Sequence, residues 1–160
     1  MSLKLENTLR KNMQADAALR ETVADWLVGE SDDYTHSVTP TFPYEPRDSD
    51  EAERILGRFK KYLNKECFRR PKTPDAHVKM AVVQEGQRFA KRIHYHCAMR
   101  KPDKFTNREF ERRIKKAWRN AVRNYKARID IQPYAKGWLP YITKEVSRTN
   151  TSGISQHNDF

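Results

Sequence analysis

The sequence predicts an α+β domain, an antiparallel sheet with helices packed on one face in a ferredoxin- or RRM-like arrangement, plus an extra N-terminal helix. Segments with apolar residues at helical spacing alternate with short segments rich in β-branched and aromatic residues. Their order is helix, strand, helix, two strands, helix, strand and helix, in a chain of 160 residues. That length suits one domain with one core. The face of the sheet without helices is then free for a ligand.

The first expected element is a helix over residues 3–28, ended by Gly29. Its apolar residues recur at helical spacing, but Asp16 falls within the apolar stripe. The helix is therefore expected to be broken or only partly buried. This extension, residues 1–34, either packs on the domain or binds a partner, and packing is the interpretation that we favour.

A strand is expected over residues 35–42, followed by a helix over residues 50–66. Pro40 has no N–H to donate, so we expect this strand at an edge of the sheet or at a bulge. Asp48 or Ser49 is suited to cap the helix, because a short oxygen-bearing side chain can accept a hydrogen bond from the first turn.

The next two strands are predicted to form a hairpin. Residues 77–84 are apolar on both faces, which indicates a well-covered central strand. A turn follows Glu85, and the chain returns through residues 93–97. Side chains alternate between faces of a strand, so His94 and His96 point the same way, and the hairpin brings Glu85 to the same end of the sheet.

The last third of the chain predicts a capped helix from Thr106 or Asn107 to residue 124, a strand over residues 127–132 and a short helix that carries Tyr141. The long helix has one strongly basic face, made of Arg108, Arg112, Arg113, Lys115, Lys116, Arg119 and Arg123. A face of this kind is usually only solvated, and here it is also a candidate for contact with a phosphate backbone. Residues 149–160 are polar and predict a flexible C-terminal tail.

The net charge of +11 lies almost entirely in one half of the chain. Residues 1–75 have 13 Lys and Arg against 14 Asp and Glu, and the remainder has 19 against 7. This asymmetry favours a polyanionic partner, nucleic acid first, over a basic surface that only confers solubility. The sequence predicts no membrane span, no signal peptide and, from the isolated Cys67 and Cys97, a reducing compartment such as the cytoplasm.

Glu85, His94 and His96 form a candidate metal site. Two imidazoles and one carboxylate leave positions open on a divalent ion, as a catalytic metal requires. Tyr141 and Lys144 are one helical turn apart and share a face. A phenol, with a pKa of about 10, becomes a useful nucleophile where its target is polarised and a cation stabilises the developing charge. Without further support, both groups are ordinary surface residues.

Three motifs add that support: Val-Thr-Pro-Thr-Phe at 38–42, His-Tyr-His at 94–96 and Tyr-Ile-Thr-Lys at 141–144. Their order and spacing resemble the motifs of HUH endonucleases, in particular the single-tyrosine rolling-circle replication initiators (Rep proteins) of plasmids, phages and small single-stranded DNA viruses. The resemblance covers residues 35–147, so we expect an endonuclease domain over residues 35–148. Pro40 departs from the first motif.

The resemblance implies that Glu85, His94 and His96 hold Mg²⁺ or Mn²⁺. Tyr141 would attack the scissile phosphodiester and form a 5′-phosphotyrosine link and a free 3′-hydroxyl. Lys144 would neutralise the phosphate or orient the phenol. The implied substrate is single-stranded or hairpin origin DNA, with a host helicase and a DNA polymerase as partners, in a prokaryotic cytoplasm or, for a eukaryotic virus, the nucleus.

Thr39 and Thr41 belong to the first motif, with a structural or DNA-contacting role. Phosphate contacts are expected from the basic residues around the histidine strand: Arg92, Arg100, Lys101 and Lys104. The sequence lacks the G-x-x-x-x-G-K-[ST] motif of a P-loop helicase, so unwinding falls to a host helicase or to a part of a longer protein.

Three alternatives stay open. A single-tyrosine transposase or relaxase would use the same residues on other DNA. An Fe(II) oxygenase can use two histidines and a carboxylate but expects about eight strands, whereas four are predicted here. A non-catalytic nucleic-acid-binding domain would bind DNA without need of metal or of Tyr141.

Overall fold

The computed structural model describes residues 3–29, 32–69, 76–86, 92–146, 154–155 and 157–158. It confirms the predicted α+β class. The elements are α1 Leu3–Val28, β1 His36–Pro40, α2 Ser49–Cys67, β2 Met80–Glu85, β3 His94–Met99, α3 Asn107–Val122, β4 Ile129–Pro133, α4 Trp138–Ile142 and the 3₁₀ turn η1 Thr143–Glu145. In the described part of the chain, every helix is too short or too polar to span a bilayer.

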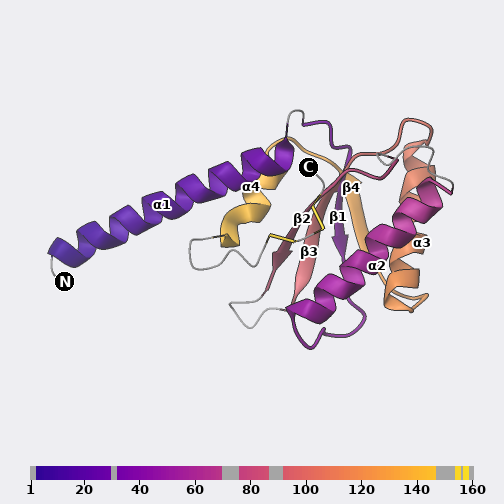
Figure 1. The fold of residues 1–160 in the computed structure, drawn as a ribbon, viewed down its shortest axis with the longest axis horizontal. Coiled ribbons are helices and arrows are strands. Elements are labelled where there is room, and N and C mark those ends of the chain that lie inside the picture. Colours follow the sequence, from indigo (N-terminus) through magenta and orange to yellow (C-terminus); the bar gives the residue numbers. More distant parts are fainter. Residues whose placement is uncertain are drawn as a thin grey trace.

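The four strands form one antiparallel sheet in the order β2-β3-β1-β4. α2 and α3 cover one face of this sheet, as predicted (Figure 1). Each of these helices begins at a side-chain cap. Asp48 Oδ1 accepts from the N–H of Glu51 at 2.8 Å, and Thr106 forms a reciprocal capping box with Glu109.

The main core lies between the sheet and these two helices. Trp118 of α3 is completely buried there, and its ring meets Phe42 and Phe59 edge to face at centroid distances of 5.3 and 5.5 Å. Its indole N–H donates to the carbonyl oxygen of Thr41 at 3.2 Å. Trp118 thus ties α3 to α2 and to the end of β1.

The predicted edge position of the first strand is wrong, because β1 lies between β3 and β4. Pro40 is the last residue of β1 and pairs with Ile129 of β4. The β1–β3 pairing ends earlier, at Val38 with Cys97, so no pair with β3 needs an N–H at Pro40. A proline is tolerated in this central strand because it stands where the ladder on one side has already ended.

The predicted central position of the second strand is also wrong, because β2 is an edge strand. All of its residues are nevertheless buried. Residues from the C-terminal segment cover it: Ile154 bridges Val83, and the side-chain amide of Asn158 accepts from the N–H of Val82 and donates to its carbonyl oxygen. The cover explains why the sequence of an edge strand is apolar on both faces.

The four described residues beyond 153 are therefore packed, in contrast to the flexible tail expected for residues 149–160. Ser155 donates to the Glu53 carboxylate at 2.9 Å, and His157 contacts the backbone oxygen of Glu53 at 3.0 Å. Residues 149–153, 156, 159 and 160 lie outside the described residues.

The second face of the sheet is covered in part. Ala81, Val83 and Ala98 of the sheet pack against Leu139 and Ile142 of α4, and the last turns of α1 join this smaller cluster. The face predicted to be free is therefore open only beyond this cluster, at the end of β2 and β3 that carries Glu85 and His94.

α1 is one continuous helix despite Asp16. Only its C-terminal part packs on the domain, through Val23, Ala24 and Leu27, while Leu9 and Met13 are exposed. Figure 1 shows the rest of α1 extending away from the sheet. The expectation of a partly buried helix is confirmed, and the expected break is absent.

We expect Trp118→Ala to lower the free energy of unfolding by about 3–5 kcal/mol, because it removes a fully buried indole and leaves a cavity among α2, α3 and β1. Tyr125→Ala is the matched control, since Tyr125 is 76% exposed, and should change stability by no more than about 0.5 kcal/mol. Urea denaturation followed by circular dichroism measures both values. A loss below about 1 kcal/mol in Trp118→Ala would contradict this packing.

Candidate active site

The β2–β3 hairpin builds a cluster of one carboxylate and two imidazoles. Its register pairs Glu85 directly with His94, and His96 lies two residues further on the same face. Glu85 Oε2 is 3.2 Å from His94 Nε2 and 3.5 Å from His96 Nε2. The three ligand atoms lie within 4.8 Å of one another, close enough to hold one metal ion.

The other ring nitrogen of each histidine is held in place. His94 Nδ1 lies 2.9 Å from the carbonyl oxygen of Arg92, and His96 Nδ1 lies 3.2 Å from Thr39 Oγ1. A protonated Nδ1 on each ring turns the Nε2 lone pair towards Glu85, the orientation that metal-binding histidines need. The Trp138 ring also packs edge to face on His96, with centroids 5.7 Å apart.

The chemistry of this donor set fits a divalent cation. Glu85 is only 3% exposed, and its Oε1 has no hydrogen-bond partner among the described residues. Burial lowers the pKa of His96, although the Glu85 carboxylate opposes the shift, so the neutral, metal-binding form of the ring is favoured. A buried carboxylate with an unused oxygen beside two neutral imidazoles is the arrangement that a bound cation completes.

α4 brings Tyr141 and Lys144 to the same place. Gly137 adopts a φ of 86° that turns the chain into the helix, and Leu139 and Ile142 are buried against the sheet. Tyr141 is therefore on the outer side of this short helix, with 63% of its surface exposed. The phenol is accessible to a large substrate.

Lys144 joins the tyrosine to the candidate metal ligands. Its Nζ lies 3.4 Å from Glu85 Oε1 and 4.5 Å from the centroid of the Tyr141 ring. Partial burial lowers the pKa of Lys144, but Glu85 and Tyr141 outweigh it, and the pKa is raised above its ordinary value. One ammonium group thus contacts both the carboxylate and the phenol.

The structure does not bring all of the predicted DNA-binding residues together. Thr39 contacts His96, and Thr41 and Arg92 lie at the same end of the sheet. Three others follow the far end of β3, about 17 Å along the strand from His94 at the usual rise per residue. There Arg100 pairs with Asp33 at 2.9 Å, Lys101 Nζ donates to the carbonyl oxygen of Phe105 and Lys104 lies over the Phe68 ring; the three are Arg100, Lys101 and Lys104.

Sequence reasoning missed Trp138 as part of the site. Its contact with His96 depends on where α4 docks, which a five-residue helix does not reveal by periodicity. The one available signal is its position three residues before Tyr141, which places both on the same short helix.

Fold and site together define an α+β protein with a candidate two-histidine, one-carboxylate metal centre. Residues 35–150 match the model of a family described as replication-associated protein ORF2. Because this match spans most of the chain, the protein belongs to that family of replication-associated proteins. Comparison with curated proteins and with solved structures gave no match.

Removing a candidate ligand should abolish tight metal binding. We expect Glu85→Gln to weaken Mn²⁺ affinity at least about 10- to 100-fold, because a neutral amide replaces the carboxylate that both imidazoles face. Isothermal titration calorimetry measures the affinity, with Glu45→Gln, an exposed glutamate outside the site, as the matched control. Equal Mn²⁺ affinity in wild type and Glu85→Gln would contradict the assignment.

Proposed function

We propose that this protein is an HUH endonuclease of the single-tyrosine Rep type, which nicks and rejoins single-stranded DNA at a replication origin. The observation that carries the proposal is the position of Lys144, whose ammonium contacts both the Glu85 carboxylate and the Tyr141 ring. A nucleophile candidate and a metal-site candidate from distant parts of the sequence are thereby linked. Membership in a replication-associated family supports the same reaction.

In this proposal Glu85, His94 and His96 hold Mg²⁺ or Mn²⁺, and the bound ion polarises the scissile phosphodiester. The Tyr141 oxygen attacks the phosphorus and loses its proton to solvent. The bond to the 3′ oxygen breaks, and that oxygen takes up a proton to leave a free 3′-hydroxyl. The Lys144 ammonium stabilises the negative charge that develops on the phenol oxygen and on the phosphate.

The product is a phosphotyrosine ester on the 5′ side of the nick. Because one phosphodiester replaces another, attack by a 3′-hydroxyl on this ester rejoins DNA without an energy source. The free 3′-hydroxyl is a primer for a DNA polymerase, and a host helicase would unwind the duplex. The 63% exposure of Tyr141 supports a polymeric substrate that reaches the phenol from solvent.

The direct test is a covalent adduct. Wild-type protein with Mn²⁺ and a pool of single-stranded oligonucleotides should give a slowly migrating protein–DNA band on a denaturing gel. EDTA should abolish the band, and so should Tyr141→Phe, which removes the attacking oxygen. The control Tyr44→Phe changes another exposed tyrosine and should leave the band intact.

Lys144→Met should lower the yield of adduct roughly 10- to 100-fold, because it removes a positive charge from the developing anion. Two results would contradict the proposal. One is an adduct that survives Tyr141→Phe, and the other is the absence of any adduct in wild type that has bound Mn²⁺. In the second case a non-catalytic nucleic-acid-binding role would replace it.

A further inference from the structure

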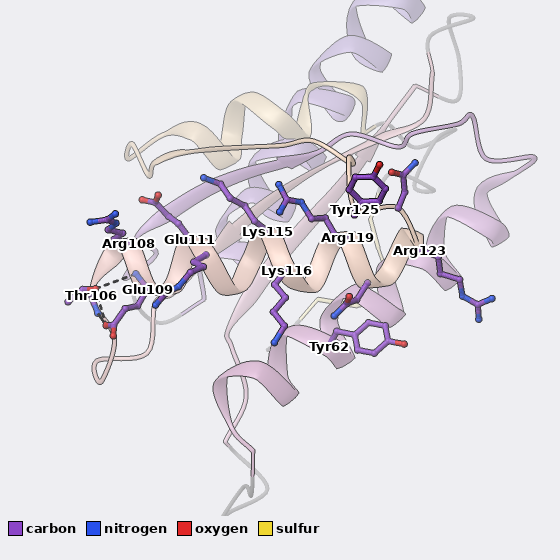
Figure 2. Close-up of a pocket in the computed structure, with 13 residues that line it drawn as sticks. Tyr62, Thr106, Arg108, Glu109, Glu111, Lys115, Lys116, Arg119, Arg123 and Tyr125 are labelled. Carbon is purple, nitrogen blue, oxygen red and sulfur yellow. Dashed lines mark hydrogen bonds between the residues drawn. The ribbon is translucent and has the colours of Figure 1, made fainter.

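A basic groove of about 1250 Å³ runs along α3, on the opposite side of the sheet from α4 (Figure 2). Its lining includes six cationic side chains and two carboxylates, Glu109 and Glu111. The cations are Arg108, Arg112, Lys115, Lys116, Arg119 and Arg123. None of them belongs to the candidate active site.

The groove has a regular row of free cations. Arg108, Arg112, Lys115 and Arg119 follow helical spacing, so they form one stripe about 17 Å long. Within the described residues, Lys116 pairs with Glu66 at 2.9 Å, whereas no ion pair of Arg112, Lys115 or Arg119 lies within 4.0 Å. In Figure 2, Lys115 and Arg119 point to the same side of α3 as Tyr125.

The stripe continues towards the active-site end of the sheet. A neighbouring hollow shares Lys115 and Arg119 with the groove and adds Thr41, Lys126 and Arg128. The N–H of Thr41 donates to the carbonyl oxygen of Arg128, and Thr41 is two residues beyond Thr39, which contacts His96. Asp130 is the acidic residue in this hollow, and its carboxylate accepts from Gln132.

The form of the groove suits a duplex better than a single strand. Single-strand sites rely on rows of aromatic side chains that stack on bases. Of the aromatic residues that line this groove, Tyr125 is exposed and Tyr62 is half-buried. A stiff row of cations about 17 Å long instead matches the high charge density of duplex DNA, about one phosphate per 1.7 Å of helix axis.

We propose that this groove binds the phosphate backbone of double-stranded DNA beside the nicking site, independently of sequence. That the duplex flanks a nick rests on the proposed function, whereas binding of the duplex itself does not require metal or Tyr141. The groove would hold the duplex arm of the origin while its single-stranded part reaches α4 around the end of the sheet.

The test compares a duplex of about 20 base pairs with one of its separated strands, in EDTA, by fluorescence anisotropy at several salt concentrations. Arg112→Gln/Lys115→Gln/Arg119→Gln should weaken duplex binding about 10- to 100-fold. It should also reduce the slope of log affinity against log salt by about 3, since three phosphate contacts are lost. Binding of the single strand should change less than about twofold.

The matched control Arg10→Gln/Lys11→Gln/Arg54→Gln removes the same charge from exposed positions outside the groove and should leave both affinities unchanged. The proposal is overturned if wild type does not bind the duplex or if the groove variant retains duplex affinity. Equal losses for duplex and single strand, or an equal loss in the control, overturn it as well. Because EDTA prevents metal-dependent nicking, a failed adduct experiment would leave these outcomes unchanged.

Discussion

The buried carboxylate of Glu85 is the constraint on which the candidate site depends. An ionised carboxylate that is 3% exposed costs several kcal/mol unless positive or hydrogen-bonding groups compensate it. The compensation comes from three directions: His94 is its direct partner across the hairpin, His96 is the next residue on that face, and Lys144 reaches it from the turn after α4. The same contacts fix the register of the hairpin and the position of the helix that carries Tyr141.

The two faces of the sheet divide the work of folding and of chemistry. α2 and α3 bury the large core around Trp118 on one face, which keeps the four strands rigid. On the other face the small cluster with α4 stops short of Glu85 and His94, so these polar side chains meet solvent at one end of the sheet. The exposed Tyr141 and the basic groove on α3 lie on opposite sides of the sheet. The proposed DNA path therefore runs around the sheet end that carries Thr41, Arg128 and the metal ligands.

The sequence was sufficient for the fold class and for the Glu85, His94 and His96 cluster, because strand alternation and a tight hairpin are local rules. It failed where a property depended on a distant neighbour. Pro40 suggested an edge strand, since the sequence does not reveal where the pairing with β3 ends. The apolar β2 suggested a central strand, since nothing local announces that Ile154 and Asn158 cover its edge. The contact of Trp138 with His96 and the separation of Arg100 from the site likewise follow from tertiary packing.

The most direct test of the central claim is to locate the DNA linkage by mass spectrometry. After reaction with a single-stranded oligonucleotide and Mn²⁺, nuclease trimming and digestion with trypsin should yield residues 137–144 with a nucleotide 5′-phosphate on Tyr141. This peptide begins after Lys136 and ends at Lys144, so it separates Tyr141 from Tyr134. Modification of this peptide alone is the expected result. A nucleotide on the peptide that contains Tyr134, or on any other residue, would contradict the assignment of Tyr141 as the nucleophile.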